Sequence, residues 1–167
     1  MVLRLSARDP LVMKWWIDGS FAVHDNMRNH TGSTMSMGTG SIWSSSIKQK
    51  LNTRSSTEAE LVAVDDMMPQ VLWTRYFLKN QGFNVGPARL LQDNKSAILL
   101  EENGIASSSK RTRHIQIRYY FVTDQIHMNT ISVEHCPTKS MVADFFTKPL
   151  QGSAFYEFRK AIMGLPD

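Results

Sequence analysis

The sequence predicts one α/β domain, built on a mixed β-sheet with helices packed on its faces. The chain has 167 residues, of which 42% are hydrophobic, and this is enough for one domain with its own core. Strand-like segments dominate the chain as far as Lys50, and helix-like and strand-like segments alternate after it. This order predicts that the first strands are antiparallel and that crossovers join the later ones.

Three strands are predicted before the first helix. Residues 12–23, VMKWWIDGSFAV, are rich in strand formers and lead into the polar loop HDNMRNHTGS. Residues 33–50 contain short runs that are broken by Gly38 and Gly40, which is typical of a hairpin. Together these segments supply three consecutive strands.

A long helix is predicted from Ser55, because apolar residues recur there every three or four positions. Its buried stripe consists of Leu61, Val64, Met68, Val71 or Leu72, and Leu78. We expect Gly82 to end the helix. Pro69 lies inside the pattern, and we expect it to kink or split the helix.

The second half of the chain alternates between the two kinds of element. The predicted order is strand 88–94, helix 95–104, polar basic loop 106–114, helix 115–127, strand 130–136 and helix 140–148. Gly104 closes the first of these helices, and Pro137 ends the last strand. Pro149 interrupts the final helix, which resumes over residues 153–164.

The composition limits the class of protein. The net charge is +4 and the pI is about 9.3, which permits a polyanionic partner. The single cysteine, Cys136, excludes an internal disulfide and fits a reducing compartment. No apolar run reaches the ~18 residues of a membrane span. Residues 1–16 lack the continuous apolar region of a signal peptide, so we expect the first residues to be a linker or a cut edge.

Four acidic residues stand at the junctions of the predicted elements. Asp18 lies in an apolar strand, and Asp93 follows another. Glu60 and Asp144 lie in the first turns of two helices. The first strand and the first crossover strand are expected to be central neighbours, and ligand sites form at the strand ends of such sheets. The four carboxylates are therefore expected to meet at one rim.

Clustered carboxylates repel one another and raise one another's pKa unless cations neutralise them. Oxygen ligands of this kind suit Mg²⁺ or Mn²⁺, and the sequence has no His and Cys set with zinc spacing. Two such ions roughly 3.5–4 Å apart can activate a water and stabilise a leaving oxygen at a phosphodiester. The residues therefore indicate metal-assisted phosphodiester hydrolysis.

Each acid also has a simpler structural interpretation. Asp18 could start a turn with Gly19, and Asp93 could cap the helix that begins near Asn94. Asp144 could be a solvated acid on a helix.

The two glutamates of SSTEAE allow two alternative capping boxes. Glu60 could pair with Thr57, and Glu58 could pair with Ser55. If Glu58 serves the helix end, Glu60 is free for the metal site, and helix geometry alone does not decide between the two.

A basic segment is the candidate surface for nucleic acid. Cations set affinity for phosphates, and neighbouring aromatic rings such as Tyr119 and Tyr120 can pack on sugars or bases. The candidate binding residues are Lys110, Arg111, Arg113, His114, Arg118, Asn94, Ser55 and Ser56. The serines and Asn94 are candidates for contacts to phosphates or to ribose 2′-OH groups. A solvated basic loop is the alternative, and the four tryptophans are expected to be packing residues.

Five segments, taken in order, resemble one family: WIDGSF, SSTEAELVAV, LLQDNKSAILL, KRTRHIQIRYYFV and CPTKSMVADFFTKPL. They are similar to the ribonuclease H domain at the end of the copia-type (Pseudoviridae-like) LTR retrotransposon polyprotein. The resemblance covers about residues 14–150. It implies a ribonuclease H-like fold with a five-stranded mixed sheet, strand order 3-2-1-4-5, and helices on both faces.

The resemblance also implies the function. The expected reaction is endonucleolytic hydrolysis of the RNA strand of RNA–DNA hybrids during reverse transcription, with two Mg²⁺ or Mn²⁺ ions. The family's carboxylates map onto Asp18, Glu60, Asp93 and Asp144, and this favours Glu60 over Glu58. The expected partners are the hybrid and an upstream reverse transcriptase domain, in a cytoplasmic retrotransposon particle or in the nucleus. We expect the domain at residues 13–150, with residues 151–167 as a helical extension and 1–12 as the linker.

One departure concerns a histidine that many ribonucleases H carry on a loop shortly before the last aspartate. Here His135 is nearby, but we expect it to end a strand. Asp65 and Asp66 resemble the paired aspartates of a polymerase only superficially, because they lie in a helical pattern. The rival interpretations are a catalytically inactive nucleic-acid-binding or polymerase-supporting domain and a transposase or integrase on the same fold.

Overall fold

The computed structural model describes residues 2–7, 11–104 and 116–166. Its centre is a five-stranded sheet with the order β5-β3-β2-β6-β7. The strands are β2 (Lys14–Ser20), β3 (His30–Ser36), β5 (Trp43–Lys48), β6 (Ala88–Gln92) and β7 (Ile131–His135). β2, β3 and β5 are antiparallel neighbours, whereas β6 and β7 run parallel to β2. The predicted mixed sheet and its order 3-2-1-4-5 are confirmed.

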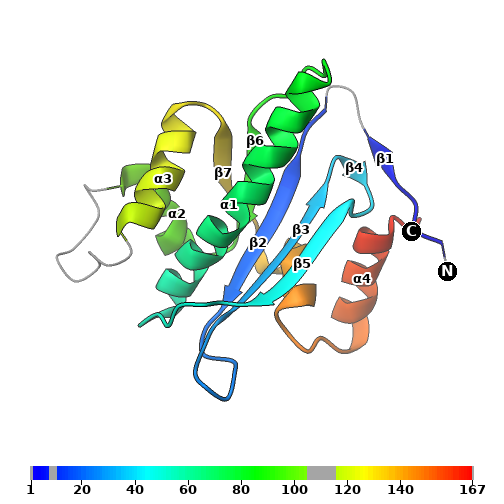
Figure 1. The fold of residues 1–167 in the computed structure, drawn as a ribbon. Helices are drawn as coiled ribbons and strands as arrows, with labels where there is room; N and C mark the ends of the chain where they lie inside the picture. The colour runs from blue at the N-terminus through cyan, green and yellow to red at the C-terminus, as the bar shows by residue number, and fades with distance from the viewer. Residues whose placement is uncertain (1, 8–10, 105–115, 167) are drawn as a thin grey trace.

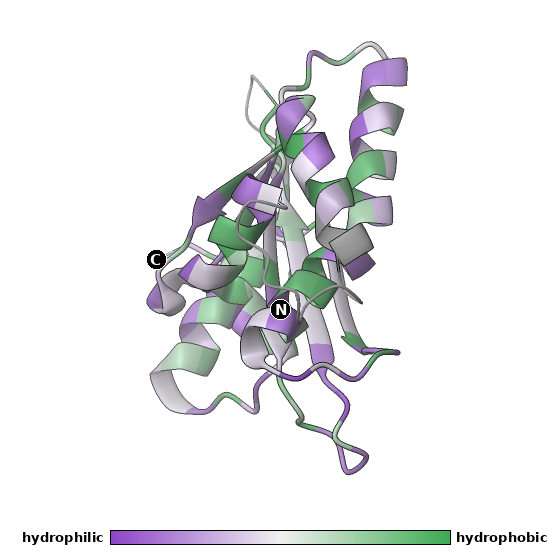
Figure 2. Ribbon diagram, turned by 90° about the vertical axis from the view of Figure 1, so that its left-hand side faces the viewer, coloured by the Kyte–Doolittle hydropathy of each residue, from purple (hydrophilic) through white to green (hydrophobic). Residues whose placement is uncertain are grey.

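Helices lie on both faces of this sheet (Figure 1). The elements are α1 (Ser56–Asn80), α2 (Lys95–Asn103), α3 (Gln116–His127) and α4 (Gly152–Met163), with the 3-10 turns η3 (Thr138–Ser140) and η4 (Val142–Phe146). A separate two-stranded sheet pairs β1 (Ser6–Ala7) with β4 (Gly38–Thr39). In Figure 2 the helices carry both hydrophobic and hydrophilic residues, and the loop between β2 and β3 is largely hydrophilic.

Alternation along β2 separates two cores. Trp15 and Ile17 are fully buried in the main core under α1. Trp16 packs on the other face, in a cluster that includes Met141 of the segment around η4. Asp18 has the parity of Trp16, so its carboxylate emerges on the face that η4 covers.

The structure corrects three expectations about the elements. β3 begins at His30, so the end of the expected polar loop is strand. α1 continues through Pro69 as one helix, so of the expected kink or split the split does not occur. Pro69 is exposed, whereas its neighbour Met68 is fully buried, so packing on the sheet outweighs the lost backbone hydrogen bond.

The segment 140–148 forms 3-10 turns in place of the expected α-helix. The Phe146 carbonyl accepts a hydrogen bond from Ser46 Oγ at 2.8 Å, and the Thr147 carbonyl accepts one from Ser20 Oγ at 3.5 Å. These two carbonyls therefore accept hydrogen bonds from serines of the sheet. Pro149 prevents the turns from continuing as a regular α-helix. α4 starts afresh at Gly152.

The tryptophans divide between core and surface. Trp15 is buried, with its ring 5.4 Å from that of Trp43. Trp73 is 60% exposed and packs on Phe77, so it lies outside the core. Trp73 is two positions from the buried Val71, which turns its side chain to the outer side of α1. None of the helices in the described ranges has the length and apolar character of a membrane span.

Candidate active site

The end of β2 and the start of α1 meet at Gly19. A Cβ at Gly19 would lie 2.5 Å from the Ala59 carbonyl oxygen, so only glycine permits this approach. The Gly19 amide donates a hydrogen bond to Glu60 Oε2 at 3.0 Å. Gly19 follows Asp18 along β2, so this contact places the Glu60 carboxylate beside Asp18.

Glu58 has a different partner, its own helix end. Ser55 is the N-cap, and its Oγ accepts from the Glu58 amide at 3.2 Å. Glu58 Oε2 accepts in return from the Arg54 amide at 2.7 Å. This is the predicted Ser55–Glu58 capping box with one difference: the Glu58 carboxylate accepts from the amide of Arg54 and not from that of Ser55. Glu60 therefore does not serve the helix end.

Asp93 follows β6 directly and accepts a hydrogen bond from Thr138 Oγ1 at 3.1 Å. The helix cap belongs to Asn94, whose Oδ1 accepts from the amides of Ser96 at 3.0 Å and Ala97 at 3.2 Å. Asp93 is thus not needed as a cap, and its carboxylate faces the rim of the sheet.

Three of the four predicted carboxylates form one compact group. Oxygens of Asp18, Glu60 and Asp93 all lie within 4.8 Å of one another. The group lines an open cleft of about 550 Å³, together with Ser56 and Asn94 among others. The arrangement offers hard oxygen ligands from three separate elements at a single point.

Asp144, the fourth predicted carboxylate, is not a member of this group of three. Asp144 is buried, and its Oδ1 accepts from Lys148 Nζ at 2.7 Å. The same Nζ lies 3.9 Å from Asp18 Oδ2. A lysine ammonium therefore contacts both Asp144 and Asp18.

The electrostatics of the group fit a divalent cation. Burial raises the pKa of Glu60 well above its usual value, and the charges of Asp18 and Asp93 raise it further. Burial likewise raises the pKa of Asp144, against the hydrogen bond from Lys148. A bound cation would offset both the burial and the mutual repulsion, and Mg²⁺ or Mn²⁺ suits an all-oxygen donor set.

Two residues of the site were missed from the sequence, Thr147 and Lys148. Thr147 Oγ1 donates to Asp18 Oδ2. Gly32 makes room for it, since a Cβ there would lie 2.5 Å from Thr147 Cγ2. The only available signal was an acid followed by a lysine four positions later, Asp144 and Lys148, which pair on one helical turn.

The predicted binding residues fall into two sets. Lys110, Arg111, Arg113 and His114 lie outside the described residues, as does the side chain of Arg118 in α3. Ser56 is exposed at the cleft, and Asn94 lines it while capping α2. Ser55 is half-buried and caps α1.

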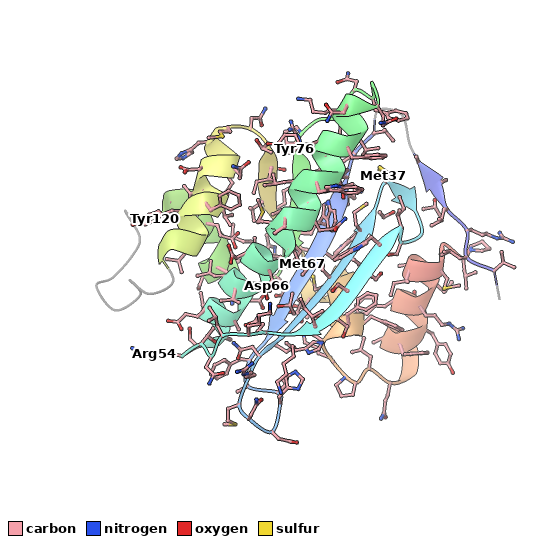
Figure 3. All side chains as sticks on the ribbon, in the orientation of Figure 1. Met37, Arg54, Asp66, Met67, Tyr76 and Tyr120 are labelled. Carbon is pink, nitrogen blue, oxygen red and sulfur yellow. The ribbon has the colours of Figure 1, made fainter. Side chains whose placement is uncertain are left out.

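The remaining expectations concern residues away from the carboxylates. His135 is exposed and ends β7, as predicted. Asp66 lies on α1 between the labelled Arg54 and Tyr76 (Figure 3), and its carboxylate accepts from Thr31 Oγ1 at 3.2 Å. Its helical setting agrees with the rejection of a polymerase motif.

Comparison with known proteins gives relatives of one kind. No family model matches the chain. The chain is 30% identical over 159 residues to the retrovirus-related Pol polyprotein from transposon TNT 1-94 of Nicotiana tabacum, which covers 94% of this chain and 12% of that protein. It is 36% identical over 121 residues to the corresponding polyprotein from transposon RE1 of Arabidopsis thaliana, and the match covers 72% of this chain and 8% of that protein. The chain thus spans about a tenth of the relatives' length.

Solved structures agree on the fold. LC11-RNase H1 from compost superposes with a TM-score of 0.57 at 14% identity, covering 81% of this chain and 91% of that one. The PFV RNase H domain gives a TM-score of 0.52 at 15% identity, covering 92% and 90%. The N-terminal RNase H domain of Rv2228c from Mycobacterium tuberculosis gives 0.52 at 12%, covering 88% and 98%.

The protein is therefore an α/β domain with the ribonuclease H fold. Because its sequence relatives are transposon Pol polyproteins, the chain belongs to that family, as the ribonuclease H domain of a copia-type polyprotein.

Proposed function

We propose that this domain hydrolyses the RNA strand of RNA–DNA hybrids in reverse transcription of the retrotransposon, with two Mg²⁺ or Mn²⁺ ions. The observation that carries the proposal is the group of three carboxylates within 4.8 Å of one another at a cleft, on a ribonuclease H fold. One relative of this fold, LC11-RNase H1, has been solved in complex with an RNA/DNA hybrid.

The carboxylates are the proposed metal ligands. Asp18, Glu60 and Asp93 would hold one ion, and Asp18 with Asp144 the other. When bound, such ions supply an activated water and stabilise the leaving oxygen. The protein's own share is to hold the ligands in place: Gly19 N–H fixes Glu60, Thr147 fixes Asp18 and Thr138 fixes Asp93.

Recognition of the hybrid is proposed for two regions. Ser56 and Asn94 line the cleft and could contact phosphates or the 2′-OH groups that distinguish RNA from DNA. Lys110, Arg111, Arg113, His114 and Arg118 supply cations for the phosphate backbone. The upstream reverse transcriptase would present the hybrid, in the cytoplasmic particle or in the nucleus.

We propose residues 13–150 as the catalytic unit, with flanking segments that pack on it. The Arg4 amide donates to the Met163 carbonyl at 2.9 Å, so residues before β2 contact the C-terminal extension. α4 itself packs beside η4, and Phe145 stacks with Phe155 at 5.2 Å between ring centroids.

The decisive test is Asp93→Asn. The change keeps the size of the side chain and removes a metal ligand, so we expect loss of cleavage of a labelled hybrid in Mg²⁺, with hybrid binding retained or tightened because a negative charge beside phosphate is gone. Asp124→Asn, at an exposed acid of α3, is the matched control and should cleave normally.

The assay also separates the rival functions. Activity should vanish in EDTA and return with Mg²⁺ or Mn²⁺. Full activity of Asp93→Asn would remove this residue from the mechanism. Failure of the wild-type protein to cleave the hybrid would favour a non-catalytic domain, whereas cleavage of duplex DNA would favour the transposase-like alternative.

A further inference from the structure

Lys148 connects two carboxylates that a metal would also connect. Its Nζ lies 2.7 Å from Asp144 Oδ1 and 3.9 Å from Asp18 Oδ2. The two acid side chains are only 7% and 4% exposed, whereas the lysine side chain is 41% exposed. The ammonium therefore reaches from the open rim into a buried pair of acids.

The fold holds Lys148 in this position through its backbone. Its amide donates to the Asp144 carbonyl at 2.9 Å, which sets the helical turn that brings the two side chains together. Thr147, the preceding residue, donates to Asp18. Ser46 Oγ holds the Phe146 carbonyl at 2.8 Å. The approach of the ammonium is thus a product of the turn, and does not depend on the lysine stem alone.

A divalent ion shared by Asp18 and Asp144 would need the same place. Mg²⁺ takes carboxylate oxygens at about 2.0–2.1 Å, so an ion between these acids would lie where the ammonium contacts them. Two cations this close also repel each other in a partly buried setting. Within the described residues, Lys148 is the one cation that contacts these carboxylates.

We propose that Lys148 occupies the second cation position of the metal-free site and is displaced when a divalent ion binds between Asp18 and Asp144. This inference rests on the proposed function and adds an order to it. The first ion binds at Asp18, Glu60 and Asp93 without disturbing Lys148. The second binds more weakly, because the Lys148–Asp144 pair must open. The exposed, flexible stem allows the ammonium to move into the cleft, where a substrate phosphate would receive it.

Titration of the metal-free protein with Mn²⁺ tests the proposal, with calorimetry and electron paramagnetic resonance to count bound ions. We expect two steps in the wild-type protein. Lys148→Met should tighten the weaker step by about tenfold, since it removes a competing charge from a half-exposed ion pair. Lys148→Arg keeps the charge and should bind the second ion no more tightly than wild type. Lys79→Met, at the far end of α1, should change neither step.

Thermal melting in EDTA checks the fold of the variants, and Lys148→Met should melt below wild type because Asp144 loses its partner. A second measurement follows the wild-type protein through a Mg²⁺ titration and needs a variant only to assign one resonance. The Lys148 Nζ resonance, assigned by its loss in Lys148→Arg, should shift with the second Mg²⁺ equivalent and not with the first.

The outcomes separate the two proposals. If wild-type protein binds no Mn²⁺, the proposed two-metal function and the role of Lys148 both fail. If it binds Mn²⁺ and Lys148→Met binds the second ion equally or more weakly, the function stands and the displacement of Lys148 is wrong. A Lys148 resonance that is indifferent to both equivalents of Mg²⁺ would also overturn it.

Discussion

Two glutamates two positions apart carry out unrelated tasks at the start of α1. Glu58 accepts from the Arg54 amide and closes the helix end, whereas Glu60 accepts from the Gly19 amide on the sheet. Residues two apart on a helix point about 200° apart, so one faces back along the chain while the other faces β2. This division leaves Glu60 with a buried charge next to Asp18 and Asp93, and makes its ionisation costly.

Replacement of each glutamate by glutamine should therefore have opposite effects. The pKa of Glu60 is raised in the folded state, so its contribution to metal-free stability is complete below the usual pKa and is lost as pH rises through the raised one. Glu60→Gln should stabilise the metal-free protein by about 1 kcal/mol or more at alkaline pH, with a smaller gain toward acid. Glu58→Gln should destabilise it by about 0.5 kcal/mol, because the cap loses its charge at the helix N-terminus.

Chemical denaturation in EDTA at several pH values measures both effects. Addition of Mg²⁺ should reverse the order for Glu60, because wild type gains binding energy that the variant cannot. A Glu60→Gln protein that is less stable than wild type at every pH would show that the ionised carboxylate stabilises the metal-free fold, and the expected cost of its burial would then be wrong.

Gly19 is the residue on which the approach of α1 depends. Gly19→Ala would place a Cβ 2.5 Å from the Ala59 carbonyl oxygen, so the first turn of α1 has to shift and carry Glu60 with it. We expect a loss of roughly 1–3 kcal/mol of stability and weaker Mn²⁺ binding. Gly86→Ala is the matched control, because a Cβ there meets nothing within 4 Å. Equal stabilities of the two variants, measured by urea denaturation, would contradict the close approach.

At the scale of elements, local patterns predicted what local interactions decide. The helix start at Ser55, the helix that begins near Asn94 and the strand within residues 12–23 each depend on residues a few positions apart, and the structure has a helix or strand at each place. Thr147 could not be found in this way, since it contacts Asp18 across 129 residues of sequence. The 3-10 form of η4 likewise depends on Ser46 from a distant strand. Contacts between residues far apart in the sequence therefore determine the role of Thr147 and the form of η4, which local patterns do not predict.

α2 carries a buried acid that is not part of the cleft. Glu101 is fully buried, and burial raises its pKa to about 8. The amide of Gln92 on β6 lies near enough to favour the carboxylate, but it makes no hydrogen bond of ordinary geometry with it. Because the folded-state pKa is raised, the stability that protonated Glu101 contributes is complete below its usual pKa of 4.5 and is lost as pH rises through about 8.

Glu101→Gln should remove this dependence. We expect wild-type stability to fall by a few kcal/mol between about pH 5 and pH 9, and the variant to lose much less over the same range. The neighbouring Glu102→Gln, at an exposed position, is the control and should follow the wild-type curve. Melting temperatures measured across the range in EDTA test this, and parallel curves for wild type and Glu101→Gln would contradict a protonated Glu101.

At the scale of the whole molecule, the net charge is positive, but the cleft proposed to receive a polyanionic substrate is acidic. The net charge is +4, yet the cleft is lined by Asp18, Glu60 and Asp93. A duplex has to approach this acidic cleft, so phosphates must be held by cations beside it, before metals reverse the local charge. The basic segment with Lys110, Arg111 and Arg113 is the densest source of cations in the sequence.

Replacement of these three residues by alanine should therefore weaken hybrid binding and reduce its dependence on salt. Each lost phosphate contact should lower the slope of log affinity against log salt by about 0.9 if the hybrid behaves like B-form DNA. The measurement is fluorescence anisotropy with a labelled hybrid and the Asp93→Asn background, which prevents cleavage during titration.

Lys79→Ala, at the end of α1 remote from Glu60, controls for the loss of positive charge in general. An unchanged slope in the triple variant would assign phosphate binding to another surface, whereas a slope that falls equally in the triple variant and in the control would attribute the effect to net charge. A lowered slope with unchanged metal affinity would separate the two halves of the site: cations that hold the duplex, and carboxylates that act on it.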